Sequence, residues 1–254
     1  MSELYKYRHM LLTMILSNMR TRYKGSFFGF LWTLLNPLLL LGVYSLVFSV
    51  VMRVDIPYYT VYLFIGLLGW VMFQSAISDS VVTMIANANL IKKIYFPREI
   101  LPISQVLASV VNYLFSLVVL FLSFFWFGMK IPITILYLPI ILLIQIILMI
   151  GISLLVSSVQ VFFRDLQHIL NIFMLVWFYF TPIVYVQSMI PDQYMTYFML
   201  NPMFYIISSY QDIFYNGSAP DLGNLTIAFI YAICLLIIGW KVFARLNRQI
   251  AEEL

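Results

Sequence analysis

Residues 131–163, IPITILYLPIILLIQIILMIGISLLVSSVQVFF, contain no Asp, Glu, Lys or Arg. A helix that crosses a bilayer needs about 20 mainly apolar residues, so this stretch is long enough for one crossing. Before and after this stretch, further charge-free windows lie at 25–52, 56–78, 100–129, 166–191, 193–211 and 222–240. The recurrence of such windows predicts a multi-pass membrane protein.

The composition agrees with this reading. The chain has 254 residues, of which 63% are hydrophobic and 9% are charged, whereas a soluble domain is about 45–50% apolar and about 25% charged. So few charges could not cover a soluble core of this size, which argues against a soluble enzyme. The single cysteine, Cys234, excludes an intramolecular disulfide, and no Cys/His spacing is typical of a metal site.

The basic residues indicate on which side of the membrane each connection between the windows lies. If 193–211 is not a span, twelve of the fourteen Lys and Arg fall on the cytoplasmic side, and only Arg53 and Lys130 fall outside. Such a bias is the positive-inside pattern. The sequence therefore predicts an all-α polytopic membrane protein with six transmembrane helices and both termini in the cytoplasm. The net charge of +4 then reports topology and not a nucleic-acid surface.

The segment between spans five and six, residues 188–215, is expected on the outer side as short, half-buried elements. Asn201-Pro202 interrupts any continuous helix there, because proline lacks an N–H and clashes with the preceding turn. We expect two short re-entrant or interfacial helices, and a plain external loop is the alternative.

The first 24 residues are expected to form an amphipathic helix in the inner-leaflet interface. Polar residues recur at steps of three and four, while Leu4, Leu11, Ile15 and Met19 occupy much of the other side. The polar stripe consists of Lys6, His9, Thr13, Ser17, Arg20 and Lys24. Arg20, Arg22 and Lys24 stand where this helix meets span one, and such side chains bind phosphate groups well. Simple anchoring and topology are the alternative use of these three cations.

The connection between spans two and three, residues 87–102, reads NANLIKKIYFPREILP. Charged residues alternate here with apolar ones, so the segment could dock an apolar ridge into a soluble partner while the charges surround the contact. The alternative is a positive loop that lies on anionic lipid. The residues expected to make the contact are Lys92, Lys93, Phe96, Pro97, Arg98 and Glu99.

Aromatic residues are abundant, with 22 Phe, 18 Tyr and 5 Trp. Most would face lipid or neighbouring helices, but two groups lie towards the predicted outer side: Tyr58, Tyr59 and Tyr62, and Trp177, Tyr179 and Tyr185. Aromatic faces pack against sugar rings while a Tyr hydroxyl still offers a hydrogen bond. These residues are candidates for a path along which a glycan slides, and an interfacial belt is the alternative.

Several kinds of chemistry find no support in the sequence. No G-x-x-x-x-G-K-[ST] is present, so the chain carries no phosphate-binding loop for ATP. No cluster of carboxylates could hold Mg²⁺ against a prenyl diphosphate, as a lipid-glycan transferase would require. Asp79 is the one ionisable residue near a span with a conceivable proton-relay role. A stand-alone channel or secondary carrier stays open as a rival, although no internal symmetry is evident.

Four passages resemble the permease subunits of ABC-type polysaccharide exporters, the family that exports O-antigen, capsule and teichoic acid. The first is RTRYKGSFFGFLWTLLNP (20–37), similar to the family's R-Y-K-x-S-x-L-G-x-x-W-x-x-x-x-P, with Phe28 in place of Leu. The others are FPREILP (96–102), FFRDL (162–166), and TPIVY (181–185) followed by LNP (200–202). Their order and spacing extend the resemblance over essentially the whole chain. The intact FPRE string resembles the O-antigen branch more than the teichoic-acid branch.

The resemblance implies a single transmembrane domain, residues 1–254, in the bacterial plasma membrane. It implies a homodimer of permeases with two separate ATPase subunits, which would carry the ATP and Mg²⁺, so the chain would not be an enzyme by itself. The interface helix 1–24, the coupling segment 87–102 and the gate-like helices within 188–215 would be working parts. The substrate would be a long glycan on a polyprenyl diphosphate, with Arg20, Arg22 and Lys24 expected to contact the diphosphate.

Overall fold

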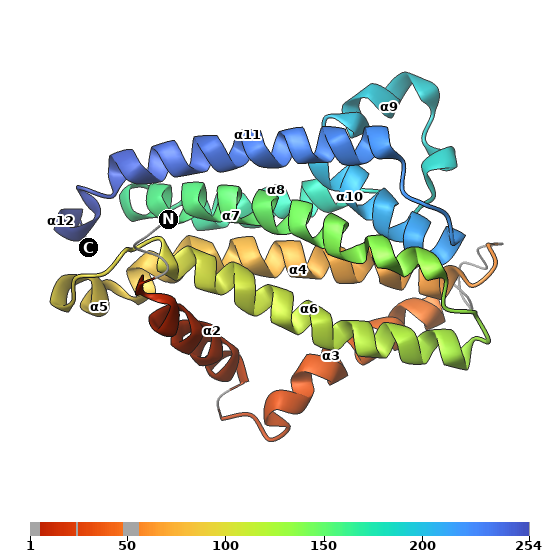
Figure 1. The fold of residues 1–254 in the computed structure, drawn as a ribbon, viewed down its shortest axis with the longest axis horizontal. Helices are drawn as coiled ribbons and strands as arrows, with labels where there is room; N and C mark the ends of the chain where they lie inside the picture. The colour runs from red at the N-terminus through yellow and green to blue at the C-terminus, as the bar shows by residue number, and fades with distance from the viewer. Residues whose placement is uncertain (1–5, 24, 48–55, 254) are drawn as a thin grey trace.

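The computed structural model describes residues 6–23, 25–47 and 56–253, and within these ranges the chain contains helices and no strand. Four long helices run side by side: α4 (Tyr59–Ala86), α6 (Ile100–Trp126), α7 (Leu138–Phe162) and α11 (Leu222–Leu246) (Figure 1). Each is long and apolar enough to cross a membrane, α7 together with the short 3-10 turn Ile133–Tyr137 before it.

The remaining two predicted spans contain shorter apolar helices, α3 (Trp32–Ser45) and α8 (Leu166–Tyr179), of 14 residues each. Fourteen residues extend about 21 Å at 1.5 Å per residue, less than the roughly 30 Å of the hydrocarbon core. Helix α8 ends just before Thr181-Pro182, where proline disfavours helical backbone at the preceding residue. Within the described residues, four of the six predicted windows thus contain a helix of spanning length.

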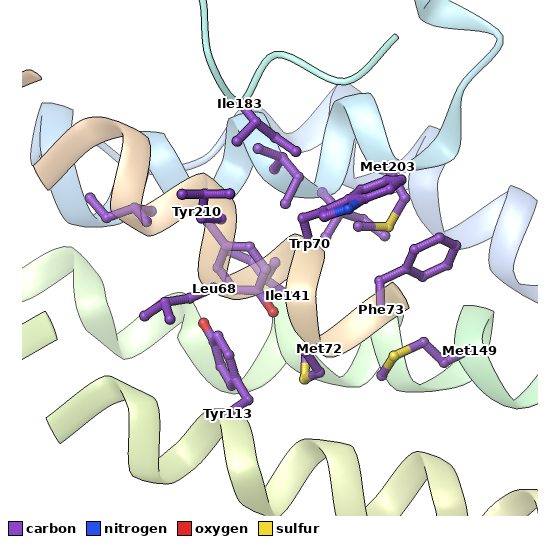
Figure 2. Packing of buried hydrophobic residues seen from close by; sticks show 14 of the residues in the cluster. Leu68, Trp70, Met72, Phe73, Tyr113, Ile141, Met149, Ile183, Met203 and Tyr210 are labelled. Atoms are coloured by element: carbon purple, nitrogen blue, oxygen red, sulfur yellow. The ribbon is translucent and has the colours of Figure 1, made fainter. Parts of the chain in front are cut away.

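Helix α4 lies at the centre of the bundle. It packs against α6, α7, α8 and α10 (Pro202–Gln211), and every residue from 59 to 70 is buried. Its sequence is apolar around the whole circumference over this stretch, which is typical of a fully enclosed helix. Figure 2 shows the result, with Trp70, Phe73 and Met72 of α4 inserted among side chains of α6, α7 and α10.

A chain of buried hydrogen bonds joins three of these helices at mid-bundle. Gln145 Nε2 of α7 donates to the Gly69 carbonyl of α4 at 2.9 Å, and the Tyr210 hydroxyl of α10 donates to Gln145 Oε1 at 2.8 Å. Tyr113 of α6 points towards Tyr210 (Figure 2). Inside a bilayer, polar groups must be satisfied by one another, so these bonds specify how the helices pack.

Between α8 and α11 the chain forms two short helices, α9 (Asp192–Met199) and α10, which are separated at Asn201-Pro202 as predicted. The expectation that both are half-buried is wrong for α10, because every residue from Pro202 to Gln211 is buried. Helix α10 fills the space between α4, α7 and α11, while α9 projects from the bundle beside the start of α11 (Figure 1).

The N-terminal segment forms α2 (Arg8–Tyr23), which lies obliquely to the long helices and packs on α6 (Figure 1). Residues 1–5 and 24 of the predicted interface helix lie outside the described residues. Of the predicted polar stripe, Lys6, His9, Thr13, Ser17 and Arg20 are exposed, whereas Leu11 and Ile15 of the predicted apolar side are half-buried and Met19 is buried. The apolar side is interrupted by Arg8, which falls on the same side as Ile15, and the neighbouring Leu12 and Leu16 are exposed. The helix packs on α6, where the Asn18 amide donates to Ser104 Oγ at 3.0 Å.

Candidate functional site

The coupling segment 87–102 lies at one end of the bundle, beside the short terminal helix α12 (Ile250–Glu253) (Figure 1). It consists of α5 (Ala88–Lys93) and a non-helical stretch that leads to Ile100, where α6 begins. The local helix ends before Pro97, since α5 ends at Lys93 and Ile94 is extended. The residue before a proline avoids helical backbone, so the stretch between α5 and α6 stays non-helical.

Apolar residues of this segment point in two directions. Phe96 is buried in a cluster with Ile91, Phe243 and Ile250, and this cluster fastens the segment to the end of α11 and to the C-terminal tail. Ile94 and Tyr95 point outward, and Tyr95 is 88% exposed. The segment is thus anchored through Phe96 and leaves Ile94 and Tyr95 exposed, which is compatible both with a docking surface and with a contact to lipid.

The charged residues of the segment have different roles. Lys92 and Lys93 are exposed, whereas the Arg98 guanidinium donates to the Asn247 carbonyl oxygen at 2.5 Å and to Asn247 Oδ1 at 3.3 Å. Arg98 therefore caps the C-terminal end of α11, where carbonyl groups otherwise lack donors. All six expected contact residues line one groove of about 480 Å³, and Asn247 and Arg248 of the C-terminal region also line it. The six are Lys92, Lys93, Phe96, Pro97, Arg98 and Glu99.

Of the three cations expected to meet a diphosphate, the structure places one side chain. Arg20 is exposed in the last turn of α2. Lys24 and the side chain of Arg22 lie outside the described residues. A cation in the last turn of a helix also interacts favourably with the helix dipole, so anchoring and phosphate binding are both compatible with the position of Arg20.

Three of the predicted path aromatics meet at the other end of the bundle. Tyr59 and Tyr62 of α4 donate to the carbonyl oxygens of Val184 and Tyr185, the latter at 3.3 Å, and the Tyr185 hydroxyl donates to the Tyr179 carbonyl at 2.7 Å. These hydroxyls satisfy the non-helical backbone that follows α8 and hold it against α4. Tyr58 and Tyr179 remain 50% and 59% exposed, so they are the members of the set with a large free surface.

Trp177 belongs to a separate surface. It lines an open groove of about 310 Å³ with Phe173, Phe180 and Tyr197, which come from α8, the turn after it, and α9. Of the six predicted aromatics, Tyr59, Tyr62 and Tyr185 thus meet, Trp177 lines a separate groove, and Tyr58 and Tyr179 are exposed.

Asn201, which the sequence singled out only as a helix break, is the hub of this region. Its Oδ1 accepts from the Met203 backbone N–H at 2.8 Å and from Trp177 Nε1 at 2.5 Å. Its Nδ2 donates to the Phe180 carbonyl at 3.0 Å and to Thr181 Oγ1 at 2.8 Å. Asn before Pro is a typical helix start, with Asn as the N-cap and Pro in the first turn. That signal was available in the sequence, but the contacts to α8 were not.

Asp212, directly after α10, interacts electrostatically with Tyr62 of the Tyr cluster. Burial raises the pKa of the Asp212 carboxyl, the hydrogen bond from Asn216 Nδ2 at 2.9 Å lowers it, and the negative charge of Asp221 raises it further. Within the described residues, no group of three or more His, Cys, Asp or Glu side chains lies close enough to hold a metal ion. Exposed cations, Lys92 and Lys93, lie at one end of the bundle, and the exposed rings of Tyr58 and Tyr179 belong to the other.

Comparison with known proteins supports a single family. The sequence model of the ABC-2 type transporter family matches residues 10–215. The chain is 37% identical over 238 residues to an O-antigen export system permease protein of Klebsiella pneumoniae, covering 93% of this chain and 92% of the relative. It is 34% identical over 254 residues to the protein of the same name in Myxococcus xanthus, covering 99% and 98%. A polysialic acid transport protein of Escherichia coli is 26% identical over 239 residues, covering 91% and 90%.

Proposed function

Because the chain belongs to the ABC-2 type transporter family, we propose that it is the membrane permease subunit of an ATP-driven exporter of O-antigen-like polysaccharide. The observation that carries this proposal is the similarity at 34–37% identity, over nearly the full length, to permeases named for O-antigen export. The chain is a multi-pass membrane protein with several apolar helices, and we place it in the bacterial plasma membrane.

In this proposal two copies of the chain pair as a homodimer, and each copy binds one separate ATPase subunit. ATP and Mg²⁺ belong to the ATPase subunits, since the chain contains no phosphate-binding loop of its own. The chain is therefore a transport subunit and not an enzyme by itself. Its cargo is a polysaccharide attached to a polyprenyl diphosphate, which moves from the cytoplasm to the outer face.

The groove at the coupling segment is the proposed docking site for the ATPase. The exposed Tyr95 and Ile94 supply an apolar contact, and Lys92 and Lys93 supply charges beside it. Because Phe96 and Arg98 tie the same segment to α11 and the C-terminal tail, a push on the segment reaches the bundle directly. This arrangement suits a part that transmits the closure of an ATPase to the membrane helices.

Cargo recognition is assigned to the two ends of the bundle. Arg20, Arg22 and Lys24 would receive the diphosphate at the cytoplasmic end, Arg by paired hydrogen bonds and Lys as a point charge. At the outer end, the exposed faces of Tyr58, Tyr179 and the Trp177 groove would contact the sugar chain. Tyr59, Tyr62 and Tyr185 would support this surface, because their hydroxyls already bind backbone carbonyls.

The test is reconstitution with an ABC ATPase subunit that co-purifies with this chain. The purified complex should hydrolyse ATP, and cells that lack the chain should accumulate lipid-linked glycan inside until the gene is restored. Transport by the chain alone, without an ATPase, would instead support the stand-alone channel or secondary carrier.

Capsule export is the second candidate, and it rests on the 26% identity to a polysialic acid transport protein. The same complementation experiment separates the two. Restored O-antigen on the cell surface supports the first proposal, and restored capsule without O-antigen supports the second. Export of teichoic acid would be recognised by its appearance in the cell wall.

A further inference from the structure

A cavity of about 420 Å³ with both polar and apolar lining lies at mid-bundle between α3, α4 and α6. This volume is within the range of about 300–1,000 Å³ that is typical of small-molecule sites. Helices α4 and α6 are spanning-length, and the cavity is lined by the middle of each, with apolar side chains such as Leu67, Leu68 and Val71 over a large part of its wall. Ser26, two residues after Lys24, also lies on the wall.

The polar groups on its wall are neutral. Ser109, Asn112 and Ser116 line it from successive turns of α6, Ser75 lines it from α4, and Asn36 lines it from α3. None of the described lining residues is charged. Such a wall offers hydrogen bonds from several directions but nothing to neutralise a phosphate or an ammonium group, so it favours an uncharged ligand with several hydroxyl groups.

Two of these side chains are buried without partners. Ser109 is 1% exposed, and its hydroxyl has no hydrogen-bond partner within the described residues. Both polar atoms of the Asn112 amide are buried and likewise unpaired within that part of the chain. A buried polar group without a partner costs about 1–3 kcal/mol. A ligand that hydrogen-bonds to these atoms would remove it.

An aromatic side chain completes the wall. Trp32 of α3 lines the cavity, and its Nε1 donates to Ser26 Oγ at 2.6 Å, which fixes the plane of the indole ring. Phe28 packs edge-on against it with ring centroids 5.7 Å apart. A fixed aromatic ring near hydroxyl and amide groups is the combination that binds a sugar ring, with apolar C–H groups on one side and hydroxyls on the other.

We propose that this cavity binds a single uncharged sugar ring, presented as the headgroup of a neutral glycolipid from the surrounding bilayer. Next to the cavity lining, α3 also carries exposed apolar side chains that do not line the cavity, including Leu38 and Leu39, and the acyl chains of such a lipid would lie along them. The site goes beyond the proposed function, because it is complete within one copy of the chain and does not depend on what is exported.

The experiment compares three lipids with identical dioleoyl chains by native mass spectrometry of the full-length protein. The protein is delipidated in lauryldimethylamine oxide, because a maltoside or glucoside detergent would itself occupy the site. The probes are monoglucosyl-dioleoylglycerol, dioleoylglycerol and dioleoylphosphatidylglycerol. Wild-type protein should retain the glucosyl lipid at least about fivefold better than dioleoylglycerol, the factor expected for one net hydrogen bond.

Asn112→Leu, which keeps the side-chain volume and removes the amide, should abolish this preference. Ser109→Ala is a smaller change that can be tested even if Asn112→Leu does not fold. It should lower the preference for the glucosyl lipid over dioleoylglycerol about threefold to fivefold. Ser153→Ala is the matched control, because Ser153 is a fully buried serine of α7 with an unpaired hydroxyl but does not line the cavity. It should retain the glucosyl lipid as well as wild type does.

Equal retention of the glucosyl lipid and dioleoylglycerol would overturn the proposal, as would preference for the anionic lipid or an unchanged preference in both α6 variants. Added free glucose identifies the source of the sugar. No displacement of the glucosyl lipid supports a membrane-anchored headgroup, while displacement at equal concentration shows a site for a soluble sugar and overturns the glycolipid assignment.

Discussion

At the scale of single residues, the cations 20–24 are the most direct test of cargo recognition. Arg20→Ala together with Arg22→Ala and Lys24→Ala should lower export at least about tenfold, because charge-assisted hydrogen bonds to phosphate are worth about 1.5–3 kcal/mol each. Membrane insertion and ATPase binding should remain. The measurement is surface glycan per copy of permease, and Lys130→Ala, an exposed cation outside the proposed site, is the control. Full export by the triple variant would show that these cations serve only anchoring.

Tyr95 tests the docking surface. Because its ring is 88% exposed and makes no contribution to the buried cluster, Tyr95→Ala should leave the permease folded and lower co-purification of the ATPase about tenfold or more, as expected for an aromatic hot spot. Arg98→Glu is less informative, since Arg98 also caps α11 through Asn247. Leu136→Ala, a 76% exposed residue at the other end of the chain's long helices, is the matched control. Unchanged assembly of Tyr95→Ala would favour the lipid-facing alternative for this segment.

Asn201 tests the hub between α8 and α10. Asn201→Ala removes four hydrogen bonds, including the N-cap of α10, and should lower the free energy of unfolding by about 1–3 kcal/mol. Thermal unfolding in detergent measures this, with Asn216→Ala as the control because Asn216 is an exposed amide with one partner, Asp212. If the two variants unfold at the same temperature, the hub does not stabilise the fold.

At the scale of helices, α7 and α11 approach each other closely where Gly151 meets Gly239. A Cβ added to Gly239 would lie 2.0 Å from the Gly151 carbonyl oxygen, and one added to Gly151 would lie 2.5 Å from the Leu236 nitrogen. Glycine is required at both positions because the two backbones touch, as at the small-residue contacts of many membrane helices.

Gly239→Ala should therefore separate α7 from α11 and destabilise the fold by about 1–3 kcal/mol, the usual cost of overpacking. Gly42→Ala on α3 is the matched control, because a Cβ there meets no atom within 4 Å, and alanine should slightly favour that helix. The measurement is the unfolding temperature of each variant in the same detergent. A Gly239→Ala protein as stable as wild type would mean that the crossing is looser than described.

At the scale of the whole molecule, α5 and α12 lie at one end of the bundle and the turn between α10 and α11 lies at the other (Figure 1). The positive-inside pattern predicts that the first end is cytoplasmic. In a Cys234→Ser background, cysteines introduced as Tyr95→Cys and Gln249→Cys should react with a membrane-impermeant maleimide only after the cells are opened. Ser218→Cys should react in intact cells, since all three positions are exposed. Labelling of all three from one side would contradict the six-span topology.

Much of the architecture follows from composition and spacing alone. Charge-free windows of sufficient length imply membrane helices because a bilayer core tolerates neither unpaired backbone groups nor many charges. The break at Asn201-Pro202 and the end of α5 before Pro97 follow from the missing N–H and the ring of proline. These constraints are local, so each can be predicted from the sequence of a single segment.

Other features depend on which segments meet. That Arg98 caps α11, that Tyr59 and Tyr62 bind the backbone after α8, and that Asn112 lines a cavity with Trp32 all involve residues far apart in sequence. The charge-free windows alone indicate a multi-pass helical protein whose charged residues lie between the apolar segments, because transfer of charge into lipid is costly wherever it occurs. Which polar groups are paired, and which stay unpaired within the described residues, depends on the tertiary arrangement, because hydrogen bonds form between neighbours in space and not between neighbours in the chain.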